Sequence, residues 1–267
     1  MSEPLESSSV VVFTGGPVLD DQVLRFVSRI EDEPAIDLVG IVSQSPVRGM
    51  RGMIVDLWRR RGILALPILL RNGLAAIINT LFRPAATLER RRSSNAVRDR
   101  THFFDDIHSE DALNHVRGLD PALGLVYGGP ILKPGLFSIP ELGTLGIHHG
   151  KVPDYRGKKT TFWALYNGET EVGVIIQKIS DRLDAGDIVR QSTLSVRNRP
   201  LPLVRQDLER IGIDLYLDAI QDVIDGTAHC VPQPAGSRPL YKDPTTIELL
   251  RFWGRYLIRL IRGRNAA

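Results

Sequence analysis

A histidine and an aspartate, 36 residues apart, are the two side chains best suited to acid–base chemistry. His148 ends a short apolar run and opens the segment HHGKVPDYRG, and Asp184 lies in the turn sequence LDAGD. An imidazole changes its charge near neutral pH, and a nearby carboxylate favours its charged form. If the two loops meet, this pair can move protons in a reaction. The alternative is structural: His148 bonds the backbone at the edge of the core, and Asp184 closes an Asx-turn.

Polar residues that follow His148 are candidates for binding a substrate. Tyr155 and Arg156 could line a pocket or hold an anionic group, and Lys151 carries a second positive charge in the same loop. Pro153 and Gly157 would stiffen and turn this loop. No Cys or His cluster has the spacing of zinc ligands, so the sequence predicts a site without a metal.

The elements that must position these residues have the pattern of an α/β fold. Residues 10–13 and 36–42 are apolar on both faces, which is typical of parallel strands covered by helices. Further strands are predicted at residues 95–104, 123–127, 144–148, 172–179 and 188–196. Helices are predicted to begin after Ser109 and to span residues 203–224 and 245–263.

Four linked motifs identify a resemblance. YGGPIL, GIHHGKVPDYRG, FWALYNGETEVGVII and LDAGDI follow one another between residues 127 and 188. This series resembles the signature regions of the folate-dependent formyltransferases, which include methionyl-tRNA, glycinamide ribonucleotide and sugar-amine formyltransferases. The resemblance covers about residues 10–224. It implies an α/β, Rossmann-like fold with a twisted, mainly parallel sheet flanked by helices, here with a helical insertion and a C-terminal amphipathic helix.

The resemblance also implies an enzyme that transfers a formyl group from the co-substrate 10-formyltetrahydrofolate to a small amine, such as an amino sugar. His148 would stabilise the tetrahedral intermediate and relay protons, and Asp184 would hold the imidazole and favour its charge. The folate site would be lined by two stretches. These are Gly129, Pro130, Ile131 and Leu132 on one side and Arg182, Leu183 and Asp187 on the other.

One position departs from the family pattern. The family usually has an Asn two residues before the catalytic His, where its amide helps to hold the formyl oxygen, and this chain has Gly146. Losing such a donor costs about two to three powers of ten in rate. Either another group replaces it, with His149 and Lys151 as the nearest candidates, or transfer is weak, altered or absent. The alternatives are a formyl-folate hydrolase or other one-carbon or acyl-type transferase, and an inactive folate-binding or membrane-surface module.

Arginines are concentrated in two regions outside the motifs. Residues 46–95 form a predicted basic helical insertion in a catalytic domain of residues 1–230, and residues 231–267 form a linker and a basic amphipathic helix. Basic helices with interspersed aromatic residues, including Phe252, Trp253 and Tyr256, are compatible with an anionic lipid surface. Nucleic acid is not the expected partner, because only about forty residues follow Gly226, and the transfer-RNA enzyme has a distinct C-terminal domain.

The composition is that of an ordinary globular protein, with 43% hydrophobic and 24% charged residues and a net charge of +3. The single cysteine, Cys230, excludes an internal disulfide framework. The polar and acidic start, MSEPLESSSV, does not resemble a secretory signal. We therefore expect a cytoplasmic protein, with a peripheral position at the inner membrane face as the additional expectation from its basic helices.

Overall fold

The computed structural model describes residues 7–16, 19–45, 97–196, 199–233 and 240–264, with a few single positions between 55 and 70. The side chains of the last helix are described as far as Tyr256. The predicted insertion at residues 46–95 therefore lies almost entirely outside the described residues. The chain divides into two compact units, Met1–Thr144 and Leu145–Ala267.

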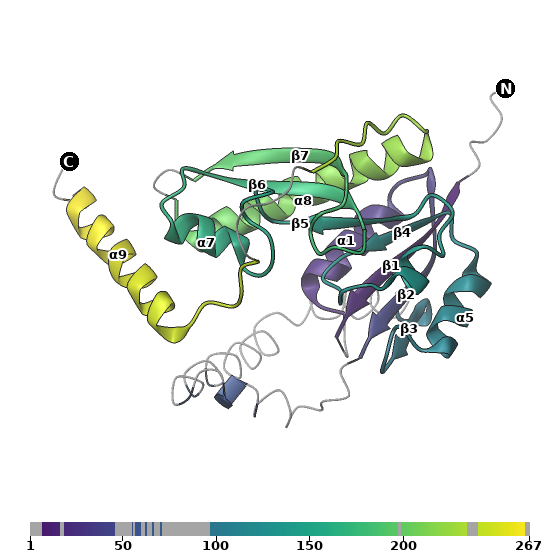
Figure 1. Cartoon of the computed structure of the whole chain (residues 1–267), viewed down its shortest axis with the longest axis horizontal. Coiled ribbons are helices and arrows are strands. Elements are labelled where there is room, and N and C mark those ends of the chain that lie inside the picture. The colour runs from purple at the N-terminus through teal and green to yellow at the C-terminus, as the bar shows by residue number, and fades with distance from the viewer. Residues whose placement is uncertain are drawn as a thin grey trace, which may run out of the picture. The chain divides into compact units, whose positions relative to one another are not determined.

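Four parallel strands in the order β3-β2-β1-β4 form the centre of the first unit (Figure 1). Four consecutive residues of β1, Val10 to Phe13, are fully buried, as expected for a parallel strand that is covered on both faces. The elements of this unit are β1 (Ser8–Gly15), α1 (Asp21–Glu31), β2 (Ile36–Gln44), β3 (Thr101–Phe104), α5 (Glu110–Leu119), β4 (Leu123–Val126) and α6 (Pro134–Phe137).

Side-chain caps fix where the helices of the first unit begin. Asp20 accepts hydrogen bonds from the backbone N–H groups of Gln22 and Val23 at the start of α1. The Ser109 hydroxyl accepts one from the N–H of Ala112 at the start of α5, which confirms the predicted cap. Such caps satisfy N–H groups that have no partner inside the helix. Both capped helices contact β2.

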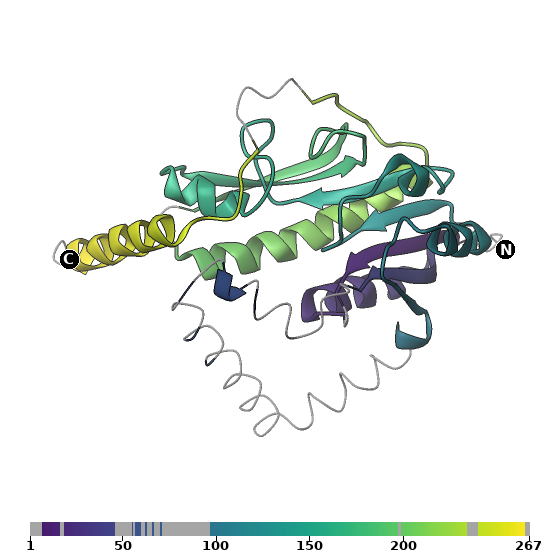
Figure 2. The ribbon, with the colours of Figure 1, turned by 60° about the horizontal axis from the view of Figure 1, so that its bottom comes forward.

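Three antiparallel strands and a long helix make up most of the second unit (Figure 2). Strand β6 pairs with β5 on one side and β7 on the other, which confirms the predicted ladder between residues 172–179 and 188–196. The elements are β5 (Thr144–His148), α7 (Thr160–Tyr166), β6 (Glu171–Lys178), β7 (Ile188–Ser195), α8 (Leu201–Ile224) and α9 (Thr246–Arg264).

Helix α8 packs along one face of β5 and β6. Gly212 lets the helix approach closely, because a Cβ there would meet Ile147 at 2.7 Å and Val174 at 3.3 Å. The buried Tyr216 hydroxyl donates to the carbonyl oxygen of Leu145 at 2.8 Å. Side chains of successive strand residues alternate between faces, so Ile147 faces α8, and Gly146 and His148 belong to the opposite face.

The start of α9 is anchored to the core of the second unit. Phe252 is buried against Phe162 and Leu201, and the Arg255 guanidinium lies 5.3 Å from the centre of the Tyr166 ring. The expectation that Phe252 belongs to a surface patch is therefore wrong, because the ring fills a core position. None of the described helices combines the length and the apolar character needed to span a bilayer.

The predicted α/β class is confirmed, with parallel strands in the first unit and helices packed beside the strands of each unit. One element differs from expectation. Residues 97–99 are helical, and the strand predicted at 95–104 is reduced to β3. The Thr101 hydroxyl donates to the Val97 carbonyl oxygen at 2.6 Å, a contact of the helical turn that ends at Thr101, the first residue paired with β2.

Candidate active site

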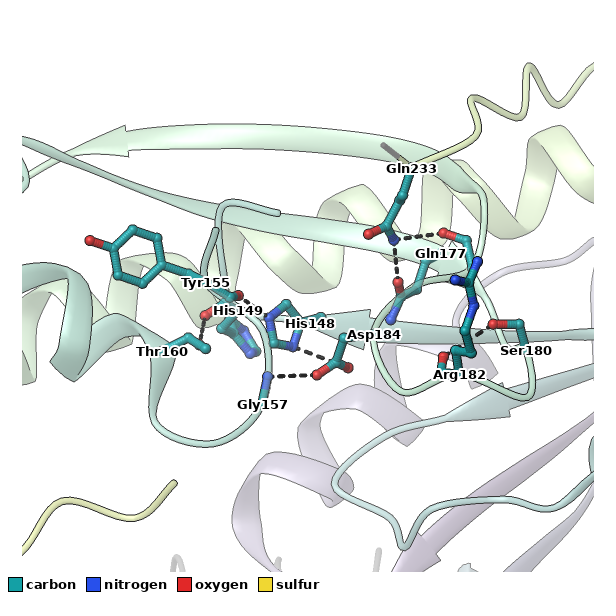
Figure 3. Close-up of polar contacts among 11 residues, drawn as sticks. His148, His149, Tyr155, Gly157, Thr160, Gln177, Ser180, Arg182, Asp184 and Gln233 are labelled. Carbon is teal, nitrogen blue, oxygen red and sulfur yellow. Dashed lines mark hydrogen bonds and ion pairs between the residues drawn. The ribbon is translucent and has the colours of Figure 1, made fainter. Parts of the chain in front are cut away.

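His148 lies at the carboxyl end of β5 with both ring nitrogens engaged (Figure 3). Nε2 is 2.7 Å from the carbonyl oxygen of Tyr155, and Nδ1 is 3.4 Å from Oδ1 of Asp184. A carbonyl oxygen only accepts, so Nε2 carries a proton. A proton on Nδ1 as well would satisfy the carboxylate. The two loops that the sequence places far apart therefore meet at this ring, as expected.

Asp184 is held by the backbone of the opposite loop. Its Oδ2 accepts a hydrogen bond from the Gly157 N–H at 2.8 Å, and its own φ is +50°, a left-handed conformation that Asp tolerates better than most residues. Gly157 has φ +95°, and a Cβ there would lie 2.9 Å from the Tyr241 backbone nitrogen. Only glycine fits at this position, so the donor to Asp184 is fixed.

Gly150 makes the contact between His148 and Tyr155 possible. A Cβ at residue 150 would overlap the Tyr155 carbonyl oxygen and His148 Nε2, and would lie 2.9 Å from His148 Cδ2. Gly186 has a similar role, because a Cβ there would overlap the Lys178 carbonyl oxygen. Neither glycine was identified as a site residue from the sequence. The sequence HHGKVPDYRG has two glycines in the spacing GxxxxxxG, but it does not indicate which groups those glycines contact.

His149, a candidate for catalysis, belongs to the opposite face of β5 from His148. Its Nε2 approaches α8, 3.8 Å from Oε2 of Glu209, and has no hydrogen-bond partner among the described residues. Burial, and then the neighbouring His148, lower the pKa of His149 to about 4. The ring as a whole is 31% exposed, whereas Nε2 itself is buried.

The three substrate-binding candidates have different surroundings. The Tyr155 side chain is buried and its hydroxyl donates to Glu169 at 2.7 Å, so this residue acts on His148 through its backbone. Lys151 is exposed, with Nζ 3.8 Å from Oε2 of Glu171. Arg156 has a buried Nε with no hydrogen-bond partner in the described part of the chain. Arg156 is therefore the best placed of the three to receive an anionic group.

A second polar group not identified from the sequence lies beside this site (Figure 3). Gln233 donates from Nε2 to the Gly186 carbonyl oxygen at 2.6 Å and to Oε1 of Gln177 at 2.7 Å. Gln177 is 3% exposed and pairs across the strands with Gly146. A glutamine in an apolar strand gives little signal in a sequence, and Gln233 follows the strand by more than fifty residues.

The stretches expected to contact folate lie in different units. In the first unit, Ile131 is 69% exposed, whereas Leu132 is buried in the core with Phe13 and Leu136. Pro130 is half-buried and Gly129 exposed, and a Cβ at Gly129 would crowd the end of β1. Leu132 therefore stabilises its loop by packing its side chain into the core. It is not available to contact a ligand through its side chain.

In the second unit, the loop between β6 and β7 carries the other three folate candidates. Leu183 is 39% exposed, and Arg182 and Asp187 are exposed as well. The Ser180 hydroxyl donates to the Arg182 carbonyl oxygen at 3.1 Å. The Lys178 N–H donates to the carbonyl oxygen of Asp187. Within the described ranges, no group of three or more His, Cys, Asp or Glu side chains could hold a metal ion.

Residues 106–200 match the model of the formyl transferase family. A methionyl-tRNA formyltransferase from Pelotomaculum thermopropionicum is 31% identical over 148 residues, which are 54% of this chain and 47% of that protein. The chain thus spans about half the length of the curated relatives it matches.

Solved structures with the same fold cover more of the chain. The phosphoribosylglycinamide formyltransferase of Anaplasma phagocytophilum has a TM-score of 0.59 at 14% identity, over 89% of this chain and all of that one. A likely sugar N-formyltransferase from Mycobacterium tuberculosis, Rv3404c, has a TM-score of 0.53 at 14% identity, over 92% of this chain and 85% of that one. The similarity to the formyl transferase family thus falls on residues 106–200, which include His148 and Asp184.

Proposed function

We propose that this chain transfers a formyl group from 10-formyltetrahydrofolate to a small amine, such as an amino sugar. The observation that carries the proposal is the contact between His148 Nδ1 and Asp184 Oδ1 within the segment that matches the formyl transferase family. A folate of this kind supplies the formyl carbon and, at N10, the leaving nitrogen. The residues of the chain must then orient the two reactants and move one proton from the amine to N10.

The two contacts of the His148 ring are unequal. The hydrogen bond from Nε2 to Tyr155 is 2.7 Å long and fully inside the protein, whereas the 3.4 Å contact from Nδ1 to Asp184 is longer than a normal hydrogen bond. The strong bond fixes the orientation of the ring. Nδ1 is therefore the atom available to a reacting group, and its N–H would donate to the formyl oxygen as that oxygen gains negative charge.

Asp184 has one oxygen fixed and one available. Oδ2 is held by the Gly157 N–H, and Oδ1 faces His148 at a distance that leaves it able to accept another proton. Oδ1 would take the proton that the amine loses as its nitrogen bonds to the formyl carbon. The bond from that carbon to N10 then breaks, and N10 receives the proton. Glycine at position 146 leaves one donor to the formyl oxygen unaccounted for.

The residues expected near folate suit a flat, partly apolar ligand. Ile131 and Leu183 expose apolar side chains on the two loops, and the exposed Arg182 would offer a positive charge to an acidic tail. Within the second unit, Arg182 and Leu183 would contact the co-substrate. For the acceptor, the unpartnered Nε of Arg156 favours an amine that also carries a phosphate or carboxylate.

The test is a turnover measurement with a panel of acceptors. The full chain is incubated with 10-formyltetrahydrofolate and, separately, amino sugars, nucleotide-linked amino sugars, glycinamide ribonucleotide, methionyl-tRNA or no amine. Tetrahydrofolate release is followed by absorbance and the formylated product by mass spectrometry. Release that requires an amine supports the proposal. Equal release without any amine would identify a hydrolase, and donor binding without release would identify an inactive binding module.

We also propose peripheral contact with anionic membranes through α9. Ile247, Leu250 and Trp253 are spaced by three residues and are 60%, 64% and 41% exposed, and Arg251 is exposed between them. Such a stripe suits the interface of an anionic bilayer. Sedimentation with phosphatidylserine vesicles should fall for Arg251→Glu but not for the control Arg210→Glu on α8. Equal sedimentation of all three proteins would discard this contact.

A further inference from the structure

Gln177 lies directly across the ladder from Gly146, the position that lacks the family's amide. Strands β5 and β6 are antiparallel, with Gly146 paired to Gln177 and His148 paired to Ile175. Directly paired residues point to the same face of a sheet, and Gly146 and His148 share a face because they are two residues apart. Gln177 is therefore on the face of His148 and diagonal to it, and diagonal neighbours of this kind are typically separated by about 7–8 Å, within reach of long side chains.

A carbonyl oxygen that accepted from both side chains would have to lie between the imidazole and the amide. Gly146 has no side chain to fill the space opposite Gln177, and Gln177 is buried. The other face of the same strands is covered by α8, which Ile147 and His149 approach. His149 thus faces away from this space, and Lys151 is 56% exposed in contact with Glu171. Gln177 is the better placed of the three.

The hydrogen bonds of Gln233 determine which end of the Gln177 amide is free. The Gly186 carbonyl oxygen only accepts, so the Gln233 atom beside it must be nitrogen. The same nitrogen lies 2.7 Å from Gln177, so the contacted atom of Gln177 must be its oxygen. The remaining end of Gln177 is Nε2, a donor. No hydrogen bond from this nitrogen occurs among the residues that the structure describes. The chain therefore holds an oriented, unused N–H₂ group beside the proposed site.

We propose that Gln177 is a catalytic residue whose Nε2 donates to the formyl oxygen, in place of the amide missing at position 146. The assignment rests on the proposed function. A developing oxyanion needs donors fixed in advance in a site with little water, and the Gln233 clamp provides that fixation. Glutamine is one methylene longer than asparagine, which suits a donor that reaches the same space from the neighbouring strand.

Gln177→Glu is the variant that isolates this role. Glutamate keeps an oxygen to accept from Gln233, so the loop stays anchored, but it has no N–H to donate when ionised. With the amine that the wild-type chain formylates, kcat should fall by about two to three powers of ten, with a much smaller change in KM for the folate. Gln191→Glu, an exposed position on β7, is the matched control and should retain wild-type kcat.

The variant Gln233→Leu distinguishes a catalytic role of Gln177 from a role in anchoring the loop that contains Gly186. If Gln177 only anchors the loop through Gln233, Gln177→Glu will retain activity and Gln233→Leu will lose it. That result, or wild-type kcat in Gln177→Glu, overturns the assignment while the proposed function stands. If the wild-type chain formylates no amine, the proposed function fails and this assignment fails with it. Urea unfolding of each variant checks that the compared proteins are folded.

Discussion

Replacing Gly150 with alanine tests whether the tight loop around His148 is needed for both stability and turnover. The added Cβ would overlap the Tyr155 carbonyl oxygen and His148 Nε2, and both belong to buried groups. Gly150 is not among the glycines with positive φ, so alanine is acceptable to the backbone itself. The whole effect therefore comes from the steric overlap.

The magnitude has two contributions. Separating His148 Nε2 from Tyr155 leaves a buried donor and acceptor unpaired, which costs about 1–3 kcal/mol. Inserting a methyl group into a packed region costs about another 1–3 kcal/mol. Urea unfolding should thus show a loss of about 2–6 kcal/mol, a large part of the 5–15 kcal/mol typical of a folded domain. Formyl transfer should fall as well, because the ring loses the bond that orients it.

Gly118→Ala provides the matched control. Gly118 is in α5, and a Cβ there would meet no atom within 4 Å, so the substitution should be neutral or stabilise by up to about 1 kcal/mol. If Gly150→Ala unfolds at the same urea concentration as wild type and retains its turnover, the contact between His148 and Tyr155 is not what holds the ring.

Three further predictions concern charged groups. Asp184→Asn keeps an oxygen for the Gly157 N–H but loses the base, so the fold should persist while turnover falls by about two to four powers of ten; unchanged turnover would exclude Asp184 as the proton acceptor. The pKa of His149 is about 4 in the folded chain and 6.5 ordinarily. As pH falls, the His149 imidazole is therefore protonated at a higher pH in the unfolded chain than in the folded chain. Stability should decline between pH 6.5 and 4 by at most about 3 kcal/mol, and His149→Gln should flatten that decline in unfolding titrations. Hydrogen bonds from Arg190 lower the pKa of Asp222, so this pair stabilises above the ordinary carboxyl pKa and the effect is lost as pH falls further. Asp222→Asn should lower the free energy of unfolding at pH 7 by no more than about 1 kcal/mol, because the pair is partly exposed. A larger loss would contradict the view that this is an ordinary surface ion pair.

Strands and helices could be predicted where the local pattern is strong. Thr144–His148 and the ladder after it follow from apolar alternation between clear turn residues, and the long α8 ends at Ile224, just before Gly226. The region before Thr101 could not be assigned correctly, because Val97 and Phe103 fit either a strand or a short helix followed by a strand. Tertiary pairing with β2 decides between them.

The approach of His148 and Asp184 could be anticipated from the resemblance of their two loops to the family's signature regions, but not from the strands alone, because β5 and β6 are antiparallel and their carboxyl ends lie at opposite edges. The contacts that support the pair could not. The carbonyl oxygen of Tyr155 and the N–H of Gly157 are backbone groups, and their positions depend on how the loop folds. For Tyr155, a side chain that looked suited to lining a pocket is buried, and its main chain makes the useful contact. Such backbone contributions leave no chemical signature in the residue type.

The stretch that follows α8 is hydrogen-bonded to both loops of the candidate active site. Val231 exchanges backbone hydrogen bonds with Ile188, and Gln233 binds the Gly186 carbonyl oxygen. Further on, the backbone of Tyr241 bonds to Arg156 and Lys158 on either side of Gly157. A shortened protein that stops at residue 230 would keep every strand yet lose these ties. Cleavage by a protease after α8 should therefore abolish activity while the protein remains folded.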